Sequence, residues 1–573
     1  MPGGLIQLVG TGAQNELVNG SPSMTHFRSV YRRHTNFAME QIRMTFSASN
    51  LELSPTGTRT ISCRIDRIAQ LLHDTYLVFT LPDIWSPLKT ISGTPPSGYD
   101  PRSNALGYEF QWIRNIGYNM IDHVDLVMNG QVIQRLRGEW LKMYSYMTHD
   151  ANKRAIVDEM VGNVPALYDP ANAYDRQNQY PHAIAPAGPS LPSAAPRTLV
   201  PEPSIRSRQL IVPLHFWFCE NPGLALPLVS LQNSEVYINV TLRNLNDLYT
   251  VVDINPASLT FGQRVKPTGD MEWNALKLFL SPPTTTGAPS DPAVTTWFPD
   301  PYLEGNFIYL TEMEMNQLAR ADQTFLIKTV RYVSAEGQFG GNTDLEIPMF
   351  NLVTRVVFES QRSDRIAVND WDNYTNWANP QRAPWSAINS SVSTSIYASG
   401  QQQVSSIFPR DAVADGLLLL DGKERFQTKP IPFFSLQQMY RHVTGNVPNL
   451  PGVYSYSFAL DHDQYQPSGA LNGSMFNKVI LRLTLQTPLP QSVTPQGGAT
   501  SSIVCVLKST VFSPNPTVIP AAQIPLYDPS ELVTVVQTNN NVIFTFTYTV
   551  GAYVEAINFL RIVSGTGNLV FAS

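Results

Sequence analysis

The stretch HVDLVMNGQVIQRL, residues 123–136, shows how this chain is built. Apolar and β-branched residues lead up to Asn129-Gly130 and resume after this pair. The pattern predicts a hairpin, because both central positions of a type I′ turn need a positive φ. The segment GEWLKMYSYM, residues 138–147, follows with a helical pattern. The unit is therefore a strand, a tight turn, a strand and a short helix.

A second copy of this unit lies further along the chain. GLLLLDGKERFQ, residues 416–427, contains an Asp-Gly turn, and FFSLQQMYRH, residues 433–442, supplies the helix. An aromatic strand and a β-branched strand follow each helix: VPLHFWF and SEVYINVTL, then VYSYSFAL and NKVILRLTL. Gly130 and Gly422 lie about half the chain apart, which indicates two duplicated domains and not a solenoid. We expect each domain to have its own core.

Strand-like segments bounded by turn residues recur along the whole sequence, so we predict an all-β protein. The clearest strands are Thr58–Ile65, Thr75–Leu81, His123–Met128, Leu210–Phe218, Glu235–Leu242, Asn351–Glu359, Val453–Leu460, Lys478–Leu485 and Val542–Val550. A third helical pattern covers Thr311–Leu326, and the helix candidate around Glu312–Ala321 within it is the natural joint between the domains. Long segments rich in Pro, Gly, Ser and Thr separate the strands: Ser86–Leu106, Ala171–Arg208, Ser281–Pro301, Asp364–Asp415 and Thr487–Ser502.

The composition indicates a protein with large buried interfaces. Only 15% of the 573 residues are charged, against roughly 25% in typical soluble proteins. We interpret this deficit as surface covered by copies or partners. Most basic residues are Arg, which interfaces favour, although a genomic codon bias explains this equally well. The net charge of −6 disfavours a protein that coats nucleic acid.

Cysteine usage and the absence of an export signal predict folding in a reducing compartment. Cys63, Cys219 and Cys505 are too few and too far apart for a disulfide framework. No Lys or Arg precedes Arg28, and no apolar run reaches about 20 residues. We therefore expect a soluble protein that does not use the ordinary secretory route.

Several long segments resemble the major capsid proteins of nucleocytoplasmic large DNA viruses, a family that includes phycodnaviruses, iridoviruses and mimivirus relatives. The opening GGLIQLVGTGAQNELVNGSPSMTHFRSVYRRHTNFAMEQI resembles the family's N-terminal arm and first strand. Further resemblances, in family order, are LPLVSLQNSEVYINVTL, NDWDNYTNW, LLLLDGKERF, GVYSYSFALDHDQYQPSGALNGSMF and EAINFLRIVSGTGNLVFAS. The usual QPSGT reads QPSGA here, and the loops do not match.

This resemblance implies two consecutive eight-stranded antiparallel jelly-roll barrels with long loops and a few short helices. The expected parts are an arm at 1–25, a first jelly roll at 26–311, a connecting helix at 312–326 and a second jelly roll at 327–573. Three copies would form a pseudo-hexagonal capsomer that tiles an icosahedral shell. The implied location is the virion, after assembly in the host cytoplasm. The implied partners are neighbouring capsomers and minor capsid, cement and penton proteins, without direct genome binding.

The motifs give no indication of an enzyme. Gly416–Lys423 differs from a phosphate-binding loop, because five residues separate its glycines and Glu424 replaces the Ser or Thr that would bind magnesium. The nine histidines show no HxH or HExxH spacing, so we expect no catalytic, cofactor or metal site. We interpret Asp461-His462-Asp463 as a solvated loop.

Two surface features leave alternatives open. Arg28, Arg32, Arg33 and His34, interleaved with Phe27, Tyr31 and Phe37, form a basic cluster. It could contact an internal membrane or an acidic partner, or it could pair with carboxylates of the same chain, which we favour. Trp371, Trp377 and Trp385 would suit a sugar-binding loop or simply pack a loop onto the body. A minor capsid paralogue is the other alternative to a major capsid protein.

Overall fold

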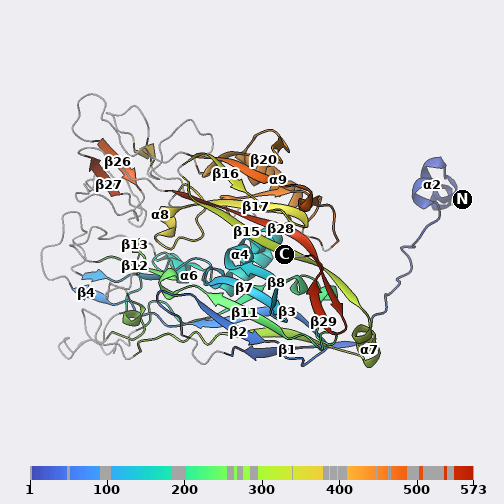
Figure 1. The fold of residues 1–573 in the computed structure, drawn as a ribbon, viewed down its shortest axis with the longest axis horizontal. Coiled ribbons are helices and arrows are strands. Elements are labelled where there is room, and N and C mark those ends of the chain that lie inside the picture. The colour runs from blue at the N-terminus through green and yellow to red at the C-terminus, as the bar shows by residue number, and fades with distance from the viewer. Residues whose placement is uncertain are drawn as a thin grey trace.

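The computed structural model describes residues 3–47, 52–90, 105–176, 179–183, 202–254, 264–267, 275–283, 294–338, 340–377, 386–387, 396–397, 410–445, 450–462, 464, 466–486, 502–506, 534–538 and 547–571. Two stacked pairs of β-sheets make up the body of the molecule (Figure 1). The fold is a double jelly roll.

The first jelly roll consists of two antiparallel sheets with four main strands each. Its main sheet has the order β1 (Phe37–Thr45), β14 (Tyr302–Leu310), β3 (Leu71–Leu81) and β9 (Arg208–Leu214), with β10 (Leu226–Pro227) also paired to β3. Its second sheet has the order β2 (Arg59–Arg64), β11 (Val236–Leu242), β7 (Ile121–Met128) and β8 (Gln131–Arg137). A small sheet joins β13 (Arg264–Val265), β12 (Tyr249–Val252) and β6 (Phe110–Trp112).

The second jelly roll repeats this strand order. Its main sheet has the order β15 (Gln323–Gln338), β28 (Tyr548–Val563), β17 (Leu352–Arg362) and β23 (Val453–Ser457), with β24 (Leu471–Asn472) also paired to β17. Its second sheet has the order β16 (Gly341–Glu346), β25 (Val479–Leu485), β20 (Val413–Leu420) and β21 (Lys423–Glu424), with β22 (Lys429–Pro430) on β20. The predicted eight-strand plan is therefore confirmed twice, although the described strands form paired sheets and not closed barrels.

The two predicted hairpin turns have the expected backbone. Asn129 and Gly130 have φ values of 51° and 79°, and Asp421 and Gly422 have values of 47° and 78°. Both central residues of each turn are thus left-handed, as type I′ requires.

Three helices follow the sequence prediction closely. They are α4 (Gly138–Thr148), the pair η7 (Phe433–Gln437) and α9 (Gln438–His442), and α7 (Glu312–Arg320) between the jelly rolls. The prediction of helix up to Leu326 is wrong at its end, because β15 begins at Gln323 and pairs with β28. The predicted strand Leu210–Phe218 also ends early, at Leu214, and Trp217–Cys219 forms the short helix η2.

The other described elements are short or lie outside the paired sheets. They are α1 (Gly3–Val9), α2 (Ala13–Asn19), β4 (Leu88–Thr90), β5 (Ala105–Gly107), α3 (Ile116–Asn119), α5 (Ala151–Val161), α6 (Pro165–Tyr168), η1 (Ala173–Asp175), η3 (Pro222–Leu224), η4 (Leu245–Asp247), η6 (Leu276–Phe279), α8 (Ser363–Ile366), β18 (Ser386–Ala387), β19 (Ile396–Tyr397), η9 (Gly473–Met475), β26 (Ser502–Val506), β27 (Thr534–Thr538) and β29 (Thr566–Leu569). Residues 542–546 of the predicted strand Val542–Val550, and most of the predicted loops, lie outside the described residues.

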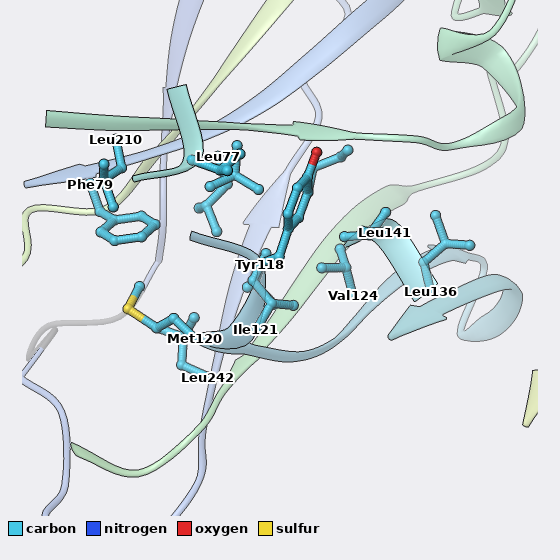
Figure 2. Packing of buried hydrophobic residues seen from close by; sticks show 14 of the residues in the cluster. Leu77, Phe79, Tyr118, Met120, Ile121, Val124, Leu136, Leu141, Leu210 and Leu242 are labelled. Atoms are coloured by element: carbon cyan, nitrogen blue, oxygen red, sulfur yellow. The ribbon is translucent and has the colours of Figure 1, made fainter. Parts of the chain in front are cut away.

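The hydrophobic core of the first jelly roll extends into the second. Figure 2 shows Phe79 of β3 beside Leu210 of β9, and Val124 of β7 beside Leu141 of α4, in the first core. The same cluster includes Val357 and Tyr553, which belong to the second main sheet. A smaller cluster lies wholly within the second jelly roll. Each jelly roll thus has a core of its own, as expected, and the first core additionally continues across the contact between the jelly rolls.

Candidate assembly interface

Helix α4 of the first jelly roll packs on one side of the second main sheet (Figure 1). We call this side, which points away from the second core, the second outer face; it carries Arg355, Glu359, Tyr553 and Glu555. The Trp140 and Tyr553 rings lie 5.5 Å apart, and both side chains are buried. This contact joins the two jelly rolls into one unit.

Further contacts extend along the same interface. Trp217 of η2 lies 5.3 Å from Phe325 of β15, measured between ring centroids. Gln134 Nε2 donates a 2.8 Å hydrogen bond to the Lys328 carbonyl oxygen. The run Phe216, Trp217, Phe218 is fully buried, which explains why its aromatic pattern resembles a buried strand although the backbone turns into a short helix there.

Gly138 allows α4 to begin close to the preceding strands. A Cβ at this position would lie 2.2 Å from the carbonyl oxygens of Tyr118 and Ile121. This close approach places the helix directly after β8 and under the second main sheet.

Glu139 and Tyr553 connect the two jelly rolls through a buried carboxylate. Tyr553 Oη donates a 2.7 Å hydrogen bond to Glu139 Oε2. Arg243 Nη2 donates a 2.6 Å hydrogen bond to Glu139 Oε1. Burial opposes ionisation of Glu139, but Arg243, Arg137 and Lys142 outweigh it and lower the pKa to about 2. Glu139 therefore stays charged as an anchor of the interface.

Lys142 is a fully buried cation on α4 that bonds to the second jelly roll. Its Nζ lies 2.5 Å from Asp372 Oδ1. Asn119 and Asn115 also donate to Asp372. Burial alone would raise the pKa of Asp372. The charge of Lys142 and the hydrogen bonds from Lys142 and the two amides outweigh burial, so the pKa is lowered. Asp372 lies in the NDWDNYTNW segment, which thus serves the contact between jelly rolls.

Arg355 and Glu555 form an ion pair on neighbouring strands of the second outer face. Arg355 Nη2 lies 2.7 Å from Glu555 Oε2, and the two side chains are 0% and 1% exposed. The guanidinium also lies 5.4 Å from the centroid of the Trp140 ring. Helix α4 therefore covers a complete pair, whereas an isolated buried charge would be strongly unfavourable.

Glu359 is a buried carboxyl of this interface that has a raised pKa, in contrast to Glu139. Burial raises its pKa to about 8, and the nearby Glu139 adds to the rise. Its Oε2 atom has no hydrogen bond within the part of the chain that the structure describes. Sequence reasoning missed these groups, although charged residues inside apolar segments such as NLVTRVVFES and GEWLKMYSYM were a usable signal.

The first main sheet carries the same residue pattern in the same register. TYLVF of β3, residues 75–79, corresponds to TRVVF of β17, residues 354–358. In the first sheet Tyr302 pairs with Val78, and Glu304 pairs with Tyr76.

The second sheet shows the equivalent pairs. Tyr553 pairs with Val357, and Glu555 pairs with Arg355. Tyr-Leu-Glu of β14 thus matches Tyr-Val-Glu of β28. We call the side that carries Tyr76, Tyr302 and Glu304 the first outer face; these three side chains are only partly buried.

The N-terminal segment stands away from the body. Every residue of α1 and α2 is exposed, and Figure 1 shows α2 separated from the sheets. Arg28, Arg32, Arg33 and His34 are exposed as well. Among the described residues none of them forms an ion pair, so the favoured hypothesis of pairing with carboxylates of the same chain is wrong for this conformation. Phe27 and Tyr31 between them are 99% and 86% exposed.

The tryptophan and histidine candidates belong to packing. Trp371 is partly buried, donates from Nε1 to the Asp247 carbonyl oxygen over 3.0 Å and lies under Arg243. It is therefore not a free platform for a sugar ring. Trp377 is partly buried, and Trp385 lies outside the described residues. His462 is 3% exposed, so the solvated-loop interpretation is wrong at this residue.

The described residues show neither a cluster of metal ligands nor a helix that could span a membrane. They contain no group of three or more His, Cys, Asp or Glu side chains placed to hold a metal ion. Among them, no helix has both the length and the apolar character needed to cross a membrane.

Comparisons with known proteins match both jelly rolls. Residues 25–298 match the family described as major capsid protein N-terminus, and residues 314–517 match the family described as large eukaryotic DNA virus major capsid protein. The chain belongs to the large DNA virus major capsid protein family. Members of this family are structural proteins of the virion capsid and not enzymes.

Individual relatives cover nearly the whole chain. The major capsid protein of Phaeocystis pouchetii virus is 26% identical over 550 residues, covering 86% of this chain and 95% of the relative. That of Paramecium bursaria Chlorella virus 1 is 25% identical and covers all of both chains. A chain of the PBCV-1 capsid structure aligns with a TM-score of 0.58 at 20% identity, covering 96% of this chain and 100% of that chain. This structural match supports the double jelly-roll fold.

Proposed function

We propose that three copies of this capsid protein form a capsomer with six similar lobes, and that these capsomers tile an icosahedral shell. The observation that carries the proposal is the duplicated sheet order, since each chain supplies two lobes of the same topology. A closed threefold ring of such chains presents a nearly hexagonal outline, which suits lattice packing. The low charged fraction of 15% agrees with large permanent contacts.

Light scattering on the purified full-length chain tests this proposal. We expect a mass of three times 63.7 kDa that persists on dilution. A well-behaved monomer at micromolar concentration would contradict it.

We propose domain limits that follow the elements. The arm covers 1–25, the first jelly roll 26–311, the connection 312–326 and the second jelly roll 327–573. In support, α7 separates β14, the last strand of the first jelly roll, from β15, the first strand of the second. Residues 323–326 at the end of the connection belong to β15.

We further propose that the arm is an assembly element that contacts minor capsid, cement or penton proteins and neighbouring capsomers. Its exposed apolar residues, and the exposed basic cluster that follows it at Arg28–His34, support this role, because exposed apolar side chains favour contact with a partner. The basic cluster also suits the anionic surface of an internal membrane. Cys63 and Cys219 are free thiols, which fits assembly in a reducing host cytoplasm. Genome binding and a catalytic role are not part of the proposal.

Deletion of Met1–Gly20 tests the arm. The shortened chain should still form the trimer but should fail to build shells in an assembly reaction. Loss of folding on deletion would show that the arm belongs to the body. Co-flotation with anionic but not neutral vesicles, lost in an Arg28→Ala, Arg32→Ala, Arg33→Ala variant, would identify a membrane as the partner.

A further inference from the structure

A pocket of the first jelly roll lies between α6 and the segment that leads into β9. Its volume is about 440 Å³, which is within the range of roughly 300–1,000 Å³ that sites for small molecules occupy. Leu167 and Ile205 are buried apolar members of its lining, whereas Arg206 and Ser207 are exposed polar members. The pocket therefore suits a molecule that has both apolar and polar surface.

Positive charge predominates in this lining. Its charged residues are three arginines and one glutamate: Arg176, Arg206, Arg208 and Glu202. This excess of cations occurs on a chain whose net charge is −6. A guanidinium group binds carboxylate, sulfate or phosphate through planar pairs of hydrogen bonds. The lining therefore favours a ligand that carries an anionic group.

Two of the arginines have carboxylate partners of unequal strength. Arg208 pairs with Glu159 beside the pocket. Arg206 Nη2 lies 3.6 Å from Glu202 Oε2, and the two side chains are 77% and 78% exposed. An exposed pair of this kind contributes little free energy. An anionic ligand can therefore replace Glu202 as the partner of Arg206 at small cost.

Arg176 is held in position by an uncharged acceptor. Its Nη1 atom donates a 3.1 Å hydrogen bond to the Pro170 carbonyl oxygen. Within the described residues Arg176 forms no ion pair, and its side chain is only partly buried. The guanidinium thus has a defined position and keeps its charge for a ligand.

Tyr174 supplies an exposed aromatic ring at the same pocket. Its side chain is 78% exposed, and its ring centroid lies 5.3 Å from the Arg176 guanidinium carbon. The φ values of Tyr174 and Asp175 are 56° and 59°, a region that residues other than glycine rarely adopt and that recurs at ligand-binding sites. A tyrosine ring has an apolar face and a polar tip. A sugar ring, with apolar C–H faces and a polar edge, matches this surface.

His182 adds a buried polar atom to the lining. Its Nδ1 atom has no hydrogen-bond partner in the part of the chain that the structure describes. The ring fits against the wall because Gly107 has no side chain, since a Cβ there would lie 1.8 Å from His182 Cε1. Imidazole nitrogens and the Ser207 hydroxyl can form hydrogen bonds with the hydroxyl groups of a sugar.

We propose that this pocket binds the acidic terminal sugar of a saccharide. The carboxylate or sulfate of the sugar pairs with Arg176 and Arg206, the sugar ring lies against Tyr174, and its hydroxyl groups bond to His182 and Ser207. The volume, the aromatic ring and the neutral polar groups exceed what an inorganic anion would use, which favours a sugar. All of these groups belong to one chain, so the site does not depend on the proposed trimer.

Saturation-transfer difference NMR on the purified full-length chain tests this site. The probe is methyl β-D-glucuronide, and the neutral match is methyl β-D-glucoside, which has a hydroxymethyl group in place of the carboxylate. The methyl group of both probes stands for the rest of a saccharide chain. We expect the glucoside to bind at least about tenfold more weakly, because it lacks the charge-assisted hydrogen bonds to arginine.

Arginine variants show whether the glucuronide binds in this pocket. Arg176→Gln and Arg206→Gln should each weaken binding by about tenfold or more. The exposed position of Arg206 makes a folding defect in its variant unexpected, and circular dichroism checks both variants. The matched control is Arg561→Gln, because Arg561 is 60% exposed and lies 3.7 Å from Asp322 in a similarly loose pair outside the pocket. This control should bind the glucuronide as the wild type does.

Competition with other anions tests the class of ligand. Inorganic sulfate and AMP should displace the glucuronide only at higher concentrations than methyl glucuronide itself requires. Tyr174→Ala should weaken glucuronide binding without changing sulfate binding, because only the sugar uses the ring.

Several results would overturn the assignment. They are equal binding of the two methyl glycosides, unchanged binding in both arginine variants, and sulfate or AMP that binds as tightly as the glucuronide. A monomeric chain that still binds the glucuronide would contradict the proposed trimer and leave this site in place.

Discussion

The two outer faces carry nearly the same strands but meet different surroundings. Tyr553 and Glu555 are buried under α4, whereas Tyr302 and Glu304 remain partly exposed. The neighbouring strand supplies Arg355 beside the buried glutamate and Tyr76 beside the exposed one. A carboxylate can be buried at modest cost only when a cation and hydrogen bonds accompany it. The two faces thus differ in how their glutamate is accommodated, with an ion pair to Arg355 under α4 on one face and partial exposure to solvent on the other.

Removing the two equivalent glutamates gives the largest expected contrast. Glu555→Ala leaves Arg355 buried without its carboxylate, so the free energy of unfolding should fall by about 3–5 kcal/mol. Glu304→Ala, at a partly exposed position, should change it by less than about 1 kcal/mol. Thermal and urea unfolding followed by circular dichroism measure both.

A double change provides the control for this contrast. Arg355→Met with Glu555→Leu removes both charges and should recover most of the loss. Equal losses for the two single glutamate variants would mean that the two faces are equally covered and would remove the basis of the comparison.

The free energy of unfolding should vary with pH because of Glu359. Its counterpart in the first jelly roll, Thr80, does not titrate. Burial raises the pKa of Glu359 to about 8 in the folded chain, from an ordinary value of 4.5. The folded state therefore holds the proton more tightly, and its contribution to stability is complete below about pH 4.5 and lost as the pH rises through 8. Glu359→Gln should stabilise the chain at pH 9 by on the order of 2–4 kcal/mol relative to wild type.

Unfolding curves collected from pH 5 to pH 9 measure this effect. The variant and the wild type should have similar stability at pH 5, where Glu359 is protonated and resembles glutamine. If their difference does not change with pH, Glu359 is not the group that titrates in this range.

The two hairpins should respond alike and more weakly. A Cβ on Gly130 or Gly422 would meet no heavy atom within 4 Å, so only the positive φ opposes a side chain. Gly130→Val and Gly422→Val should each lower the free energy of unfolding by about 1–3 kcal/mol. Gly12→Val is the control, since φ at Gly12 is −127° and its surroundings are open. A much larger loss in one hairpin would show that the turns are not equivalent.

Local patterns predicted the repeat because the relevant forces act over a few residues. The Asn-Gly and Asp-Gly turns, the alternation in SEVYINVTL and the helix GEWLKMYSYM each followed from backbone preference and periodicity. The burial of Lys142, Glu139 and Glu359 could not be predicted in this way. It results from contacts between segments more than 200 residues apart, such as Lys142 with Asp372.

The same reasoning explains the errors. Phe216, Trp217 and Phe218 looked like a strand because every position is apolar. All three are buried, but the strand has ended and Trp217 begins a short helix. Gln323–Leu326 continued a helical pattern, but pairing with β28 determined its conformation. In both cases a distant partner prevailed over the local preference.

The position of β28 in the sequence affects the order in which the protein can mature during synthesis. The first main sheet receives its central strand, β14, by residue 310, whereas the second must wait for Tyr548–Val563 near the end of the chain. A nascent chain can therefore complete the first jelly roll on the ribosome while β15 and β17 still lack the strand that joins them. Because β28 also carries Tyr553 and Glu555, the surface that receives α4 exists only after translation is nearly finished. A prematurely terminated chain would lack both the closed second sheet and the joined pair of jelly rolls, so translation itself restricts which chains are available to enter a shell.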